Sequence, residues 1–264
     1  MRKYFLLFIC ALIYVFPFYS MILVALRPES LSFSMNMLPT YLTLENFERI
    51  FKYHSFGRYF LNSLTVAFSG AFFSTLFAFL SAYTFAKEDF PLKDFFYTLF
   101  ISTLLVPGIL FMIPQFLIVV YLRWLDTFWG LFVPHLANVF GFIFLTEYIR
   151  NIPDDLIHSA IIDGAGKLRI IFQIIFPLSL PMLLTIFLLS FQFHWNNFLW
   201  QLLVTTKSKM FTIPVGLASL NSMYQEYYGA KMAGATLSII PIIILFTLFQ
   251  KYFIKGIIKG GLKF

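Results

Sequence analysis

Residues 170–206 read IIFQIIFPLSLPMLLTIFLLSFQFHWNNFLWQLLVTT, which is 37 consecutive positions without Asp, Glu, Lys or Arg. As one helix this run would be about 55 Å long, whereas the hydrocarbon core of a bilayer is about 30 Å thick. The run is therefore apolar enough for a membrane but too long for one crossing. Proline interrupts helical hydrogen bonding, so Pro177 and Pro181 are the expected points of division. This places a membrane-spanning helix over residues 181–204.

The composition of the whole chain excludes an ordinary soluble domain. Hydrophobic residues make up 60% of the sequence and charged residues 12%, and the mean hydropathy is +0.83. Soluble domains are about 45–50% apolar and about 25% charged. A single cysteine, Cys10, rules out an intrachain disulfide, and the four histidines lack the spacing of a metal site. Lipid is the expected solvent for much of the surface.

Further charge-free runs mark the other membrane spans. The expected spans are residues 4–26, 59–86, 95–122, 127–146, 181–204 and 232–250. The first run exceeds the 7–15-residue apolar region of a signal peptide, so it is interpreted as an uncleaved helix. The sequence thus predicts an all-α membrane protein, with one transmembrane domain of six helices over residues 1–264.

The distribution of Lys and Arg predicts the orientation, because cytoplasmic loops carry an excess of both. With the N-terminus inside, the inner segments hold eleven of the 19 basic residues: Arg2, Lys3, Lys87, Lys93, Arg150, Lys167, Arg169, Lys251, Lys255, Lys259 and Lys263. This favours a multi-pass protein of the cell (inner) membrane with both termini in the cytoplasm. The net charge of +7 needs no nucleic-acid partner, since the basic residues form no contiguous stripe.

The longest inner connection, residues 147–176, predicts a short amphipathic helix. Pro153 suits a first helical turn, and Asp154 and Asp155 follow where the helix dipole favours negative charge. The apolar positions of this helix form one stripe: Leu156, Ile157, Ala160 and Ile161. Such a helix is too short to be stable alone, so it is expected to dock through its stripe.

A bend follows this helix. Gly164 and Gly166 supply the turn, and glycine can adopt the positive φ that such a turn uses. The side chain of Asp163 can bond nearby backbone N–H groups there. A second helix is expected over residues 167–175, with Pro177 ending it.

The sequence of this segment resembles the permease signature of ABC importers, which is Glu-Ala-Ala, three residues, Gly, nine residues, Ile-x-Leu-Pro. The matching positions are His158, Ser159, Ala160, Gly164, Ile174, Phe176 and Pro177. The most faithful part is Asp163-Gly164-Ala165. His158 stands in place of the signature's Glu, so any ion pair that this Glu makes would need a substitute such as Asp154 or Asp155.

The resemblance extends over about 220 residues and is closest to the carbohydrate-importer branch, in its maltose-transporter-like second permease. It is carried by residues 60–63, 82–87, 90–91, 106–107, 113–114, 125–131, 195–200, 213–218 and 250–256. It implies that the inner connection is a coupling helix that docks on an ATP-binding subunit. The implied coupling residues are Asp154, Asp155, His158, Ser159, Ala160, Ile161, Asp163, Gly164, Ala165, Gly166 and Pro177.

The resemblance also implies the partners: a second permease, two ATP-binding subunits, an extracellular or periplasmic solute-binding protein, and the lipid bilayer. The chain itself lacks a GxxxxGK phosphate-binding loop, because Leu168 follows Gly164-Ala-Gly-Lys167 where Ser or Thr is required. It is therefore expected to be no enzyme and to hold no cofactor, with ATP and Mg bound by the partner subunits.

Polar residues inside the spans are candidates for the solute path, since such groups usually face the interior of a bundle. Amides suit sugar hydroxyls and aromatic faces suit sugar rings, which favours Trp195, Asn196 and Asn197, with Gln115 as a further candidate. Helix–helix contact is the alternative role. Adjacent residues are 100° apart on a helix, so Trp195, Asn196 and Asn197 are not expected to share one face.

The function expected from these observations is a permease subunit of an ATP-driven importer of a sugar or oligosaccharide. An alternative is the same architecture with another solute, such as a polyol, glycerol phosphate or polyamine. A secondary transporter is a second alternative, although intramembrane carboxylates and inverted repeats, which ion coupling normally uses, are not found in the sequence.

Overall fold

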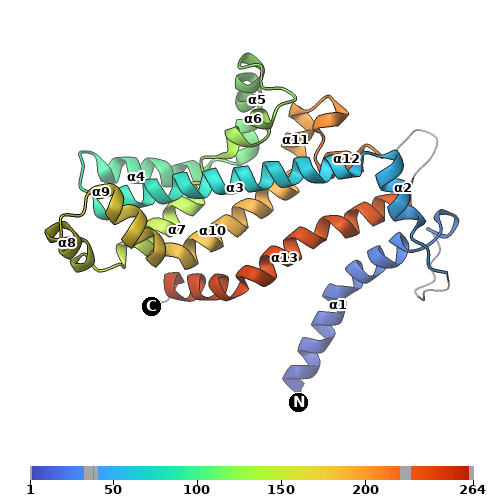
Figure 1. The fold of residues 1–264 in the computed structure, drawn as a ribbon, viewed down its shortest axis with the longest axis horizontal. Coiled ribbons are helices and arrows are strands. Elements are labelled where there is room, and N and C mark those ends of the chain that lie inside the picture. Colours follow the sequence, from blue (N-terminus) through green and yellow to red (C-terminus); the bar gives the residue numbers. More distant parts are fainter. Residues whose placement is uncertain (1, 33–37, 39–40, 221–226, 262–264) are drawn as a thin grey trace. The chain divides into compact units, whose positions relative to one another are not determined.

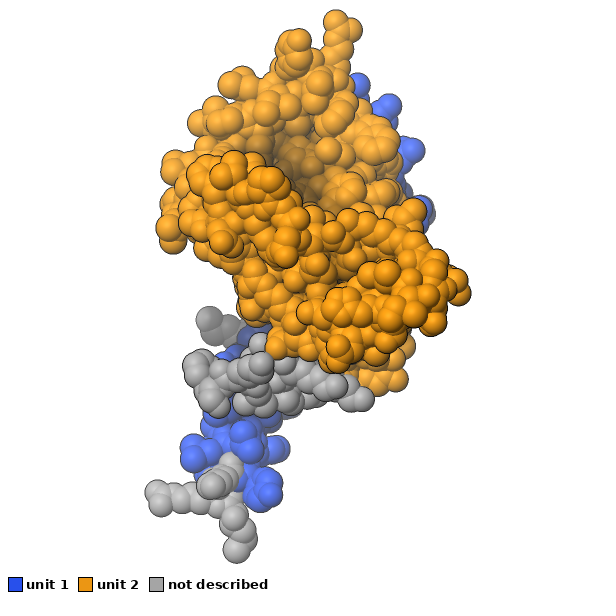
Figure 2. Space-filling model, turned by 90° about the vertical axis from the view of Figure 1, so that its left-hand side faces the viewer, with its two compact units in different colours: residues 1–63, 207–244 blue, residues 64–206, 245–264 orange. Residues whose placement is uncertain are grey.

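The computed structural model describes residues 2–32, 38, 41–220 and 227–261, and every regular element within those ranges is a helix (Figure 1). The expectation of an all-α protein is confirmed. The chain divides into two compact units (Figure 2). Unit 1 comprises Met1–Ser63 and Lys207–Ile244, and unit 2 comprises Leu64–Thr206 and Leu245–Phe264.

Four stretches of helix are long and apolar enough to cross a membrane. They are Tyr4–Ala25 within α1 (Arg2–Ala25), α3 (Phe56–Lys87), Lys167–Asn196, and Tyr228–Tyr252 within α13 (Tyr228–Gly261). Two bent pairs of helices also qualify: Lys93–Leu105 with Gly108–Tyr121, bent by 99°, and Phe128–His135 with Val139–Arg150, bent by 49°. The described residues thus contain four candidate spans, or up to six if each bent pair is one span.

The third and fourth predicted spans, residues 95–122 and 127–146, are not continuous helices. The third contains α4 (Lys93–Ser102), η2 (Thr103–Leu105), η3 (Gly108–Phe111) and α5 (Met112–Tyr121). Its break lies at Val106, which is extended at φ −86° and ψ 121° because the following residue, Pro107, disfavours helical backbone before it.

The fourth contains α6 (Phe128–Phe132), η4 (Val133–His135) and α7 (Val139–Arg150). A new helix starts at α7, because the side chain of Asn138 accepts a hydrogen bond from Gly141 N at 2.7 Å and so caps its first turn.

The boundaries predicted for the fifth span, residues 181–204, are wrong. The helix runs through both prolines as α9 (Lys167–Arg169), a π-helical turn (η5, Ile170–Ile175) and α10 (Phe176–Asn196). Pro177 lies in the first turn of α10, directly after the wider π turn, where its missing N–H costs little. The helix ends instead at Asn196, and α11 (Leu199–Val204) follows.

A buried amide links two helices of unit 1. Besides α1 and the first residues of α3, it contains η1 (Glu29–Leu31), α2 (Glu45–Tyr53), η6 (Ser208–Met210), α12 (Ile213–Ala218) and the start of α13. The buried amide of Asn46 donates to Ala25 O at 3.0 Å and to Arg27 O at 2.6 Å. These bonds satisfy carbonyls that the end of α1 leaves unpaired.

The core of unit 2 is aromatic and aliphatic. It joins the second half of α3 to α7, α10 and the short helix α8 (Asp155–Ile162). Phe85 and Phe142 meet edge to face, with ring centroids 5.1 Å apart, and Ala160 of α8 is buried in the same cluster. Figure 1 shows α8 and α9 at one end of unit 2, and Figure 2 looks onto that end and shows a hollow in the surface of the unit.

Candidate functional site

The short helix α8 lies within the predicted segment, but Pro153, which was expected in its first turn, precedes the helix. Asp154 precedes it as the N-cap residue, and Asp163 follows it. The bend after it is a Schellman motif, in which Ala165 N donates to Ala160 O at 2.9 Å and Gly164 N donates to Ile161 O at 3.0 Å. Two carbonyls at the end of α8 are thereby satisfied.

Gly164 is required at this bend by its backbone conformation. Its φ is +78°, a region that residues with a Cβ adopt at a cost, and a Cβ at this position would meet nothing within 4 Å. Glycine is therefore needed here for its backbone conformation and not for lack of space. The Asp163 carboxylate makes no hydrogen bond in the part of the chain that the structure describes, so the bend is held by the backbone bonds alone.

The predicted apolar stripe of α8 divides between two faces. Ile157 and Ala160 pack against the core of unit 2 together with Ala165. Leu156, Ile161 and Ile162 are 44%, 56% and 86% exposed. Half of the predicted stripe thus attaches α8 to its own chain, and the other half, Leu156 and Ile161, is exposed.

Among the predicted coupling residues, Asp154, Asp155, His158, Ser159, Ile161, Asp163, Gly164 and Gly166 are exposed, Ala165 is half-buried, and Ala160 is buried. Pro177 is exposed and lies in α10, on the far side of the π turn from α8. The structure thus gathers the residues from Asp154 to Gly166 around one helix and leaves Pro177 outside that group.

Two ion pairs tie the ends of the α8 segment to the end of α3. Lys87 Nζ lies 2.7 Å from Asp154 Oδ1, and Glu88 Oε1 lies 2.9 Å from Lys167 Nζ. The hydrogen bond from the Lys87 ammonium, together with its charge, lowers the pKa of Asp154 from its ordinary value. No local sequence pattern predicts either pair, because the partners are 67 positions apart for Lys87 and Asp154 and a similar distance apart for Glu88 and Lys167.

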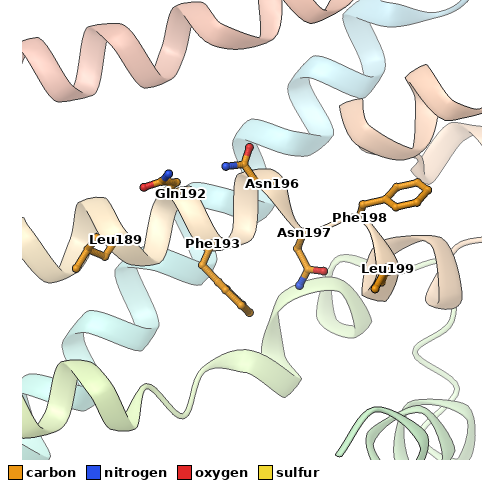
Figure 3. Close-up of a pocket in the computed structure, with 7 residues that line it drawn as sticks. All are labelled: Leu189, Gln192, Phe193, Asn196, Asn197, Phe198 and Leu199. Carbon is orange, nitrogen blue, oxygen red and sulfur yellow. The ribbon is translucent and has the colours of Figure 1, made fainter. Parts of the chain in front are cut away.

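The candidate solute residues are brought together only in part. A pocket of about 570 Å³ opens beside the end of α10 and the start of α11, and its lining consists of Leu189, Gln192, Phe193, Asn196, Asn197, Phe198 and Leu199. Figure 3 shows Gln192 and Asn196 projecting to one side of α10, whereas Phe193 and Asn197 project to the opposite side. Asn196 and Asn197 both belong to the lining, although their side chains project to opposite sides of the helix.

Trp195 and Gln115 do not line this pocket. Trp195 is 3% exposed and stacks on Phe191, with ring centroids 5.5 Å apart. The amide of Gln115 donates to Pro134 O at 3.5 Å. For these two residues the helix-contact alternative fits the geometry better.

Three lining residues, Gln192, Phe193 and Phe198, were not among the predicted site residues. Gln192 could have been found from its spacing, because it lies four residues before Asn196 and therefore on the same helix face. Phe198 could not, since it enters the lining through the break between α10 and α11, which the sequence placed at the prolines instead.

Other polar residues near the pocket serve as helix contacts. Asn138 donates from its amide to Ser190 Oγ at 2.9 Å, and Gln201 donates to His194 O at 2.9 Å. Trp200 donates from its indole nitrogen to Gly130 O at 3.0 Å. These bonds hold α7, α10, α11 and α6 together around the pocket.

Comparison with known proteins places this geometry in a family. Residues 74–259 match the family described as "Binding-protein-dependent transport system inner membrane component". The arabinooligosaccharides transport system permease protein AraQ of Halalkalibacterium halodurans is 35% identical over 258 residues, which cover 96% of this chain and 92% of the relative. The sn-glycerol-3-phosphate transport system permease protein UgpE of Yersinia pestis is 29% identical over 267 residues, which cover 97% of this chain and 94% of UgpE.

A solved structure shares the fold. A chain in the crystal structure of a bacterial ABC transporter involved in the import of the acidic polysaccharide alginate superimposes with a TM-score of 0.86 and 24% sequence identity. The match covers 96% of this chain and 95% of that chain. With the family match extending over more than half of the sequence, this chain belongs to the family of inner membrane components of binding-protein-dependent transport systems.

Proposed function

We propose that this chain forms one half of the solute pathway of an ATP-driven oligosaccharide importer, and that α8 couples it to ATP hydrolysis. The observation that carries the proposal is the exposed part of α8. An eight-residue helix presents Leu156, Ile161 and Ile162 outward while its inner face is fixed to its own chain. Exposed apolar residues of this kind are typical of a docking surface.

The partners follow from this assignment. A second permease completes the pathway, two ATP-binding subunits bind ATP and Mg, and a solute-binding protein delivers the cargo. Because Asp154 is paired with Lys87, Asp155 is the carboxylate that replaces the signature's Glu toward a basic residue of the ATP-binding subunit. Closure of the ATP-binding subunits then moves α8, and with it the helices to which α8 is attached.

The cargo is an uncharged sugar chain. Amide groups and aromatic rings line the pocket, and none of its lining residues is charged. Amides exchange hydrogen bonds with hydroxyl groups, whereas a phosphate would favour Arg or Lys. The name of the AraQ relative supports an oligosaccharide. The second candidate is glycerol phosphate, the solute given in the name of the relative UgpE.

The membrane arrangement has six crossings, with both bent helix pairs counted as spans. The charge distribution supports both termini in the cytoplasm, and it places the α8 segment there as well. Met1 and residues 262–264 lie outside the described part of the chain. Reporter fusions after Arg58 and after Ser208 should be external and one after Lys167 internal. An external reporter after Lys167 would overturn the arrangement.

The coupling role is tested by substitution on the exposed part of α8. We expect Ile162→Glu to leave the chain in the membrane and to release the ATP-binding subunits during purification. Leu168→Glu is the matched control, because Leu168 is also exposed, at 70%, but lies in α9 beyond the bend. Equal retention of the ATP-binding subunits by the parent and Ile162→Glu would refute the docking assignment.

The cargo is tested separately with the solute-binding protein. A panel of arabino-, malto- and xylo-oligosaccharides with glycerol 3-phosphate should show binding of an oligosaccharide. Binding of glycerol 3-phosphate alone would replace the first candidate with the second.

A further inference from the structure

We infer that Lys87 and Glu88 form a two-point clamp that positions α8 on the end of α3, so that movement of α8 is passed to α3. The inference rests on the coupling role proposed for α8. Lys87 and Glu88 are neighbours in sequence, and they bind residues on opposite sides of α8: Asp154 before it and Lys167 after it. Both ends of the α8 segment are thus held by one point of the chain.

The first contact joins a buried ammonium group to a carboxylate that is 64% exposed. The Lys87 side chain is 5% exposed, and its ammonium donates to Asp154 Oδ1 at 2.7 Å, to Ile152 O at 2.6 Å and to Arg150 O at 3.5 Å. Two of these acceptors are carbonyls at or beyond the end of α7, where a helix leaves such groups unpaired and carries partial negative charge. Lys87 therefore joins α3, α7 and the start of α8.

The second contact is more exposed and has the opposite polarity. The side chains of Glu88 and Lys167 are 32% and 61% exposed, and an isolated pair of this kind contributes little to stability. Its effect here comes from its position, because the first contact already holds the other end of the same short segment. Together the two pairs restrict both translation and rotation of α8 relative to α3.

The clamp leaves the outward part of α8 free. Both ion pairs lie beyond the ends of the helix, and the contacts beneath it come from Ile157, Ala160 and Ala165. A helix of eight residues is not stable by itself in water, so these contacts are what keep it formed. The exposed residues Leu156 and Ile162 remain available to a partner subunit.

The clamped end of α3 is connected to the pocket by one continuous helix. Gly70 lies 17 positions before Lys87, a distance of about 25 Å at 1.5 Å per residue. There the ring of His194 packs directly on Gly70, and Gln192, Phe193 and Asn196 of the pocket lining flank His194 on α10. A displacement of α8 would thus reach α10 through α3 as well as through α9 and the π turn.

The test is a charge exchange at the exposed pair, in the assembled complex with its ATP-binding subunits and solute-binding protein. The variants are Glu88→Lys, Lys167→Glu and the double variant that carries both. Arg169→Glu is the matched control, because its guanidinium is bound within its own helical segment to Gln173 at 2.9 Å. Hydrogen exchange in residues 155–166 reports the position of α8. ATP hydrolysis, measured with and without the solute-binding protein, reports coupling.

We expect each single variant to keep its ATP-binding subunits, to raise exchange in residues 155–166 by about threefold, and to lower stimulated hydrolysis by a similar factor. The double variant should recover parental values to within about twofold, because the exchanged charges can pair again. Single variants that behave like Arg169→Glu would overturn the clamp, and so would a double variant as impaired as the worse single one.

Failure of the coupling role itself would look different. In that case Ile162→Glu would retain the ATP-binding subunits, whatever the charge-exchange variants do. Release of those subunits by Ile162→Glu, combined with parental behaviour of Glu88→Lys and Lys167→Glu, would keep the docking role of α8 and exclude the clamp.

Discussion

The ring of His194 lies directly against Gly70: a Cβ at position 70 would come within 2.5 Å of both Cδ2 and Nε2 of that ring. His194 is 2% exposed, and its backbone carbonyl accepts a hydrogen bond from the buried amide of Gln201. The ring therefore has little room to move away. This contact sets how closely α3 and α10 approach within unit 2, next to the pocket.

Gly70→Ala should therefore destabilise the protein, although alanine is the better helix former. Overpacking of a filled site costs about 1–3 kcal/mol, so the thermal midpoint in detergent should fall. Gly57→Ala is the control on the same helix, since its Cβ would make an ordinary 4.0 Å contact with Phe51. His194→Ala should lower the midpoint by itself through the cavity that it leaves, but the double variant should lose less than the sum of the two single variants, because the clash is gone. Equal midpoints for Gly70→Ala and Gly57→Ala would contradict the close packing.

The bend after α8 allows a comparison of two nearby glycines. Gly164→Ala should cost about 1–2 kcal/mol, because an L-residue resists the left-handed region that φ +78° requires. Gly166→Ala should be nearly neutral, since Gly166 has φ −71° and ψ 161° and its Cβ would also meet nothing within 4 Å. Gly164→Asn should lie between them, because Asn tolerates this region better than Ala. Thermal midpoints of the purified complex measure all three.

The segment around α8 was predictable because its signals are local. A proline at the start, a glycine at the bend and an apolar stripe between them are all read from neighbouring positions. Its division into an inner and an outer face was not predictable, because that depends on the core of unit 2. Lys87 and Asp154 are 67 positions apart, and only the fold brings them together.

The prediction of the boundaries of the fifth span was wrong for a related reason. A rule based on proline alone ends the helix at Pro177 and Pro181, but a π turn directly before Pro177 carries the helix onward. The break falls instead at Asn197 and Phe198, and it opens the pocket there. Asn196 and Asn197 were identified from their chemistry, whereas Trp195 was included with them although its position on the helix places it in the packed interior.

The pairing of Lys87 with Asp154 predicts an acid-sensitive contribution to stability. A carboxyl group with a lowered pKa in the folded protein stabilises it fully above its ordinary pKa, which is 3.8, and this contribution is lost as the pH falls through the lowered value. Asp154→Asn should therefore lower the thermal midpoint at pH values from about 7 to about 5, and the difference from the parent should shrink below about pH 4. Asp155→Asn is the control. A difference between Asp154→Asn and the parent that persists unchanged at about pH 3 would contradict this assignment.

Alanine substitutions of neighbouring residues can distinguish a role in solute binding from a role in helix packing. Gln192→Ala and Asn196→Ala remove amide groups from the lining, and each should raise the half-saturation concentration for uptake about five- to tenfold, the scale of one lost hydrogen bond to a bound solute. Trp195→Ala removes a buried ring one position away, and it should lower the thermal midpoint through the cavity that it leaves. Uptake per assembled complex should then keep its parental half-saturation in Trp195→Ala. The measurement uses the oligosaccharide that the solute-binding protein retains, in vesicles that contain the whole complex. The opposite pattern, with half-saturation changed by Trp195→Ala and not by Gln192→Ala or Asn196→Ala, would place the solute path on the other face of α10.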